Sequence, residues 1–182
     1  MTSIAKEVKA ALNEYSKFEN ADHRHTANKP ILALTDALNK LDPSYKATYF
    51  SREKRDLSNI PYNIRLTRDG KRVGVLVVTR HATNKSGNVQ LVNKKRYESN
   101  SVLECDCIDE ICVICPPEQN YDKNGSVIDN TKACFFDKQY VINAIENGKL
   151  PIKRTAEGET IMFPESWAKS EAKQVIAYKY KK

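Results

Sequence analysis

The fold is decided by residues 61–81, which read PYNIRLTRDGKRVGVLVVTRH. Apolar residues alternate with polar ones from Tyr62 to Leu66, the pattern of a strand with one buried face. The pair Asp69-Gly70 follows, and such pairs are typical of tight hairpin turns because the turn requires positive φ angles. The next run, Val73–Val78, is apolar on both faces and predicts the central, buried strand of a sheet.

Apolar residues at helical spacing predict two helices before this hairpin. Residues 4–18 carry the first stripe, and a second runs from Pro30 to Asp42-Pro43, with the polar stretch Glu19–Lys29 between them as a loop. Downstream, we expect a helix that begins at Asp137 and ends at Gly148. Short strands are predicted on both sides of it, at residues 89–92, 102–115, 134–136, 161–163 and 173–180.

This order of elements predicts an α+β fold, with a central mixed or antiparallel sheet, N-terminal helices and one later helix packed on it. The 182 residues suit a single domain, and a hydrophobic fraction of 40% is enough to form its core. We expect residues 1–43 to be a helical segment and residues 44–182 to be a β-rich core with a basic C-terminal tail.

Membrane association and secretion are not expected. No apolar run approaches the roughly 18 residues needed to cross a bilayer. The first residues, MTSIAK, lack the apolar stretch of a signal peptide. The sequence therefore predicts a soluble, cytoplasmic protein with no membrane partner.

The span from Pro61 to His81 resembles the core hairpin of the restriction-endonuclease-like, or PD-(D/E)XK, nucleases. In that family a helix precedes a strand that bears an Asp, a glycine turn follows, and the next strand carries Glu-x-Lys or Gln-x-Lys. Here Asn63 stands at the Asp position, and Leu76 and Val78 stand at the positions of Glu or Gln and of Lys. The resemblance therefore implies a nuclease scaffold that lacks its catalytic residues.

The chemistry of such a site explains why these replacements matter. Two acidic oxygens hold Mg²⁺, and the lysine helps to activate water and to stabilise the developing phosphate charge. An amide is a poor Mg²⁺ ligand, and valine does neither task. A metal-dependent nuclease remains a third hypothesis, in which Asp69, Glu53 and Asp56 supply an unorthodox metal site.

Charge is distributed unevenly along the chain, which carries a net +7. Residues 45–96 hold 13 Lys and Arg against 3 acidic residues, whereas residues 97–130 hold 8 acidic residues against one Lys. The last residues, 167–182, are basic again. A basic block of this size is the electrostatic pattern of a surface that binds phosphates.

Nucleic acid, DNA or RNA, is therefore the expected partner, bound without catalysis by a basic β-hairpin surface. Tyr97, beside the basic run at residues 94–96, offers a ring on which a base can stack. The alternative interpretation is a solvated strand face that keeps the protein soluble. The candidate binding residues are Arg52, Lys54, Arg55, Arg65, Arg68, Lys71, Arg72, Arg80, Lys94, Lys95, Arg96 and Tyr97.

A second functional hypothesis uses the opposite charge. The acidic region 98–122 is a candidate contact surface for another protein, which would make the chain an interaction or inhibitor module. Retention on heparin or DNA, against retention on a protein bait, separates this hypothesis from nucleic-acid binding.

Five cysteines, four of them within residues 105–115, are the remaining chemical signal. An odd count in a chain without a signal peptide argues against a disulfide framework. Cys105, Cys107, Cys112 and Cys115 form two close pairs, which would bind zinc if four thiolates converged at about 2.3 Å. The alternative is that they are buried thiols in a strand, where cysteine acts as a small apolar residue and no cofactor is needed.

Overall fold

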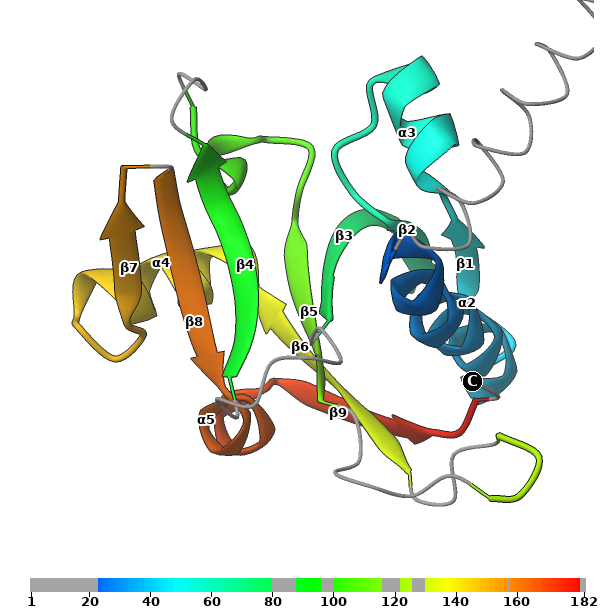
Figure 1. Ribbon diagram of the computed structural model, residues 1–182. Helices are drawn as coiled ribbons and strands as arrows, with labels where there is room; N and C mark the ends of the chain where they lie inside the picture. The colour runs from blue at the N-terminus through cyan, green and yellow to red at the C-terminus, as the bar shows by residue number, and fades with distance from the viewer. Residues whose placement is uncertain are drawn as a thin grey trace, which may run out of the picture.

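The computed structural model describes residues 23–79, 88–95, 100–115, 122–125, 130–156 and 158–180, and within them all side chains except those of residues 23–28, 52, 56 and 95. The predicted α+β class is confirmed. Figure 1 shows a curled main sheet whose concave side holds helix α2, residues His23–Leu41. The main sheet has six strands in the order β1 (Lys46–Tyr49), β2 (Ile64–Arg68), β3 (Lys71–Thr79), β5 (Glu110–Cys115), β6 (Thr131–Asp137) and β9 (Gln174–Tyr178).

The hairpin of β2 and β3 forms where the sequence predicts it. Asp69 and Gly70 both adopt positive φ angles, +52° and +74°, which suit a two-residue turn between antiparallel strands. On its other side β3 pairs in parallel with β5, with Val75 opposite Glu110. The predicted central position of β3 is therefore confirmed, and β5 beside it is buried at every residue.

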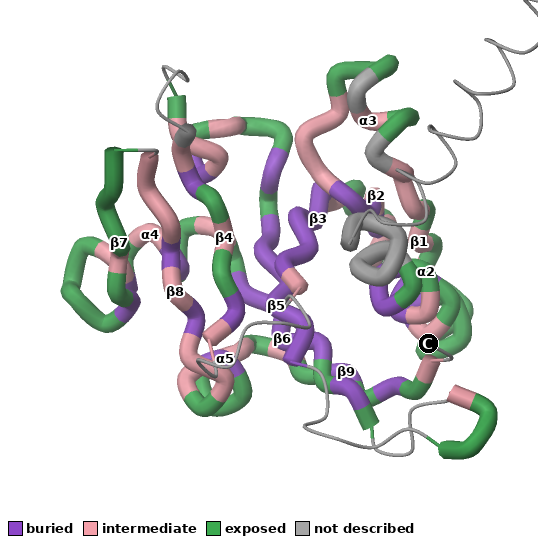
Figure 2. Tube along the Cα trace, in the orientation of Figure 1, coloured by how far each residue is buried: buried purple, intermediate pink, exposed green. Residues whose placement is uncertain are grey.

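Alternation along the central strands builds two cores, one on each face of the main sheet. Cys112 and Ile114 of β5 pack with Leu34 and Leu38 of α2 on one face. Val113 and its neighbours of the same strand pack on the other face. Figure 2 shows the buried residues concentrated in these central strands. Burial on both faces explains why the run in β3 is apolar without alternation.

A second, three-stranded sheet covers part of the face opposite α2. Its central strand contributes Ile161 and Phe163 to the core of that face, where Phe136 of β6 stacks on Trp167 at a centroid distance of 5.0 Å. The strands of this sheet and the helical elements beside it are β4 (Asn88–Lys95), β8 (Gly158–Pro164) and β7 (Ile152–Thr155), with the 3₁₀ turn η1 (Val102–Glu104) and helices α4 (Lys138–Glu146) and α5 (Glu165–Glu171).

The start of the second helix was predicted wrongly. Helix α2 begins at His23 rather than at Pro30, so part of the predicted polar loop is helical and Pro30 lies inside the helix. Proline inside a helix removes one N–H donor and its ring clashes with the carbonyl four residues earlier, which is why Pro30 predicted a first turn, but α2 continues through it. The first predicted helix, residues 4–18, lies outside the described residues.

Two further differences concern capping. Residues 102–104 form a 3₁₀ turn rather than a strand, because the Glu104 carboxylate accepts a hydrogen bond from the Ser101 backbone N–H at 2.7 Å. The sequence also gave no prediction for α3 (Arg52–Ser58), whose first turn is capped by the Ser51 hydroxyl. The hydroxyl accepts from Lys54 N at 3.2 Å.

Candidate nucleic-acid interface

The outer face of the hairpin, on the side away from α2, carries two cross-strand rows of polar residues. Lys46 of β1 is opposite Thr67 of β2, which is opposite Arg72 of β3. In the next row Thr48 is opposite Arg65, which is opposite Gly74 of β3. Directly opposed residues in antiparallel strands point to the same face.

Burial identifies which face this is. Ala47, Leu66 and Val73 alternate with the two rows and pack in the core under α2. The rows therefore point away from α2, and Lys46 and Arg72 are exposed there. We call Lys46, Thr48, Arg65, Thr67 and Arg72 the outer face.

Two aromatic rings hold the arginine at the centre of the outer face. The Arg65 guanidinium lies 4.9 Å from the centroid of the Phe50 ring. Its Nε and Nη2 donate to the Tyr62 hydroxyl at 3.2 and 3.1 Å. Phe50 and Tyr62 meet edge to face at 6.0 Å. These contacts fix a planar cation without neutralising its charge.

The outer face has no carboxylate in either of its two rows. Lys46 and Arg72 form no ion pair with any residue that the structure describes. Their charges are therefore available to an external anion. At the inner end of the second row, the Cys107 carbonyl and Tyr62 lie against Gly74, and the Asp109 carboxylate accepts a hydrogen bond from Gly74 N.

Arg68 and Lys71 belong to the opposite face. Arg68 follows Leu66 at a spacing of two and forms an ion pair with Glu110, whose side chain is only 4% exposed. Lys173 binds the same carboxylate oxygen and also contacts Asp137 Oδ1 at 2.6 Å. Arg68 is thus neutralised by the acidic middle of the chain and contributes to the fold.

The other predicted basic residues are dispersed. Lys94 lies in β4 of the second sheet, opposite Glu159 of β8. Arg55 lies on α3 near Tyr49, where burial raises the pKa of the Tyr49 phenol and the charge of Arg55 opposes that increase. Lys54, on the same helix, is exposed. The side chains of Arg52 and Lys95, and residues Arg80, Arg96 and Tyr97, are outside the described part.

The sequence-based list therefore missed part of the outer face. Lys46, Phe50 and Tyr62 were not among the candidates, whereas Arg65 and Arg72 were. The alternation along Lys46–Tyr49 could have indicated a strand with Lys46 on its exposed side. Only the pairing of this strand with β2 shows that Lys46 lies on the same face as Arg65.

The acidic region 98–122 is partly committed to the fold. Asp109 Oδ2 accepts from Gly74 N at 2.7 Å, and Asp109 N donates to Gly74 O at 2.9 Å. Glu110 is the buried partner of Arg68 described above. Glu104 caps its 3₁₀ turn and remains exposed. Residues 98–99 and 116–121 lie outside the description.

The four candidate zinc ligands do not converge. Cys112 and Cys115 of β5 are buried on opposite faces of the main sheet, and the free thiol of Cys115 is hydrogen-bonded to that of Cys134. Cys105 and Cys107 lie in the connection before β5. Burial raises the pKa of the Cys112 thiol well above its usual value. Over the described ranges, no three His, Cys, Asp or Glu side chains are grouped as a metal site.

The positions singled out by the nuclease resemblance have structural roles. Asn63 is buried, and its Oδ1 accepts from Val77 N at 2.8 Å. Leu76 and Val78 are core residues on the face opposite α2. Asp69 and Glu53, two of the proposed acidic ligands, are exposed in the hairpin turn and on α3, and the Asp56 side chain is not described.

Comparison of the chain with family models, with curated proteins and with solved structures gave no match. None of the described helices has the length and apolar character required to traverse a bilayer.

Proposed function

We propose that the chain is a non-catalytic nucleic-acid-binding protein that uses the outer face of β1, β2 and β3. The observation that supports this most directly is the row arrangement, in which Lys46, Arg65 and Arg72 share one face without a carboxylate among their cross-strand partners. Lys and Arg bind the phosphates of a nucleic acid whatever its base sequence, and this electrostatic contribution dominates non-specific affinity.

The aromatic support of Arg65 adds a second mode of contact. A guanidinium plane held over Phe50 and hydrogen-bonded to Tyr62 is already ordered before binding. Unpaired bases stack on arginine planes and on aromatic rings, so a face of this kind favours single strands over duplex. The prediction of nucleic acid as partner is thereby retained, with a different set of residues.

The experiment compares two triple variants that remove the same net charge. One replaces Lys46, Arg65 and Arg72 with alanine, and the control replaces three exposed lysines elsewhere. Binding to labelled single-stranded and duplex oligonucleotides is measured by fluorescence anisotropy over a salt titration. The control lysines are Lys132, Lys149 and Lys153.

We expect the outer-face variant to weaken binding about tenfold and to flatten the salt slope by about 2 on single strands and by about 2.7 on duplex, because each lost phosphate contact removes about 0.7 and about 0.9, respectively. The control should retain the wild-type slope. Equal weakening by both variants would show that net charge alone drives binding, and the proposal would then fail. Trp167 fluorescence verifies that each variant is folded.

A further inference from the structure

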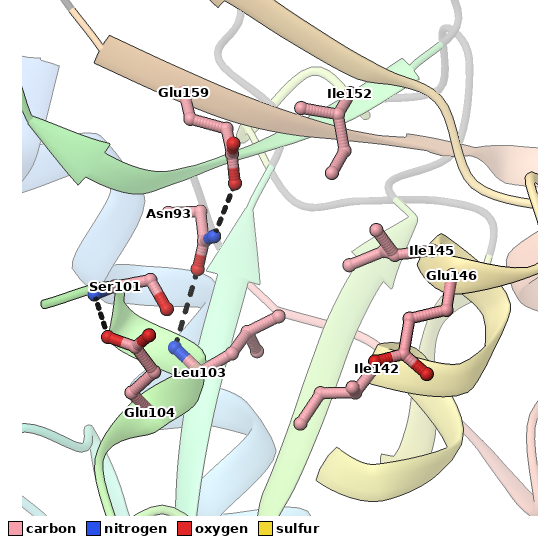
Figure 3. A pocket seen from close by; sticks show the side chains of 9 residues that line it. All are labelled: Asn93, Ser101, Leu103, Glu104, Ile142, Ile145, Glu146, Ile152 and Glu159. Atoms are coloured by element: carbon pink, nitrogen blue, oxygen red, sulfur yellow. Dashed lines mark hydrogen bonds between the residues drawn. The ribbon is translucent and has the colours of Figure 1, made fainter.

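A pocket of about 230 Å³ lies between η1, α4 and the second sheet, away from the outer face. Figure 3 shows two walls. Asn93, Ser101, Glu104 and Glu159 form the polar wall, and the apolar wall opposite consists of isoleucines from α4 and β7. The volume is below that of pockets that hold drug-sized ligands, so it suits a single long side chain.

The apolar wall offers a surface for an aliphatic chain. Ile142 and Ile145 of α4 and Ile152 of β7 are packed against the core but remain partly exposed toward the pocket. Leu103 of η1 closes its inner end. Methylene groups laid against these side chains would be removed from water, which favours binding.

Hydrogen bonds within the fold hold the polar wall in place. Asn93 is 4% exposed, donates from Nδ2 to Glu159 Oε1 at 2.8 Å and accepts from Leu103 N at 3.3 Å. Glu104 accepts from Ser101 N at 2.7 Å. The carboxylates of this wall are therefore oriented before any ligand arrives.

Three carboxylates face the pocket, those of Glu104, Glu146 and Glu159, and none of its described lining residues is a lysine or arginine. Arg154 Nε contacts Glu159 at 3.2 Å from outside the pocket. Glu146 is the last residue of α4, where the helix dipole already presents negative charge, and it has no ion pair with a described residue. Glu159 is therefore already paired, whereas Glu104 and Glu146 carry negative charge that no described residue pairs, in a protein of net charge +7.

We infer that this pocket binds an arginine side chain from a basic segment of a partner protein. The methylene stem would lie along Ile142, Ile145 and Ile152, and the guanidinium would meet Glu146 and the carboxylates of the polar wall. Arginine fits better than lysine because its planar fork donates to two carboxylates at once. This inference is independent of nucleic-acid binding, because the pocket and the outer face share no residue.

The test uses capped, labelled peptides of glycine and arginine, and matched peptides in which citrulline, the neutral isostere, replaces arginine. Binding is followed by anisotropy, and the site is located from the NMR methyl signals of Ile142, Ile145 and Ile152. We expect the arginine peptide to bind and to shift these methyl signals, and the citrulline peptide to do neither. Glu146→Gln should weaken binding about threefold and Glu146→Lys about tenfold.

Glu53→Gln on α3 is the matched control, because Glu53 is also an exposed helical glutamate. It should leave binding unchanged. Equal binding of the citrulline peptide, unmoved isoleucine methyl signals, or equal loss in Glu53→Gln would each overturn the inference. If spermidine competes at concentrations as low as the arginine peptide does, the ligand is a free polyamine and the protein partner is refuted. Neither Glu146 variant should unfold the protein, because Glu146 is exposed at the end of α4 and forms no ion pair with a described residue. The thermal midpoint measures this directly.

Discussion

Replacing Glu110 with glutamine should destabilise the fold by about 2 kcal/mol. The Glu110 carboxylate is 4% exposed, and one of its oxygens receives both Arg68 and Lys173. Glutamine keeps the shape of the side chain and removes the charge, so two cations lose their common partner. Breaking a buried ion pair costs about 3–5 kcal/mol when both partners are buried.

The expected cost of Glu110→Gln is lower than this because the two cations are not fully buried. The Arg68 side chain is 18% exposed and that of Lys173 is 33% exposed, so water partly compensates them. Lys173 also retains Asp137 at 2.6 Å. About half of the fully buried cost is therefore expected. The other Glu110 oxygen is buried and has no hydrogen-bond partner among the described residues.

Urea unfolding followed by Trp167 fluorescence measures this cost, because Trp167 is the only tryptophan and stacks on Phe136 in the core. Glu171→Gln is the control: Glu171 is exposed, accepts from the Tyr140 hydroxyl at 2.6 Å, and should cost less than about 0.5 kcal/mol. A Glu110→Gln variant within 0.5 kcal/mol of wild type, as a rough threshold, would refute the buried-charge reasoning.

Two further predictions concern the hairpin and the C-terminal strand. Gly74→Ala should lower the free energy of unfolding in urea by about 3 kcal/mol, because the new Cβ would lie 2.2 Å from the Cys107 carbonyl oxygen. Gly70→Ala has open space around its Cβ and should lower it by about 1 kcal/mol, because of the positive φ. A larger loss at Gly70 than at Gly74 would contradict the close packing at Gly74. Burial raises the pKa of Tyr178 above its ordinary value near 10, so the folded state holds the phenolic proton more tightly than the unfolded state. The free energy of unfolding should then be unaffected by this group below about pH 10 and fall above it. Tyr178→Phe loses the hydrogen bond to Pro30 O, so it should be about 1 kcal/mol less stable than the wild type at pH 7. This difference in the free energy of unfolding should shrink above pH 10, and a difference that stayed constant would refute the prediction.

The local signals in the sequence predicted the elements that local chemistry determines. Asp69-Gly70 specifies the hairpin turn, and the apolar run of β3 specifies a strand covered on both faces. Gly148 ends α4 at a positive φ of 70°. Each of these depends on residues close together in the chain, so periodicity and turn chemistry were sufficient.

The proposed binding surfaces depend instead on pairings between distant residues. The basic block was divided because β4 leaves the main sheet and pairs with β8, which places Lys94 beside Glu159. Arg68 forms an ion pair with Glu110, which lies 42 residues further along the chain. Neither event has a local signal, because both follow from the long connection between β3 and its parallel partner β5. Adjacent charges in the sequence therefore did not stay adjacent on one face.

The structure separates charges that the fold uses from charges that it leaves free. Arg68 and Lys173 both pair with the buried carboxylate of Glu110, so changing these residues should alter stability and leave the salt slope of the proposed nucleic-acid binding unchanged. Lys46 and Arg72 have no such partner among the described residues, so changing them should alter the slope and leave stability unchanged. Unpaired charges of one sign are therefore the place to test for function, because they contribute to solubility and binding rather than to the stability of the fold.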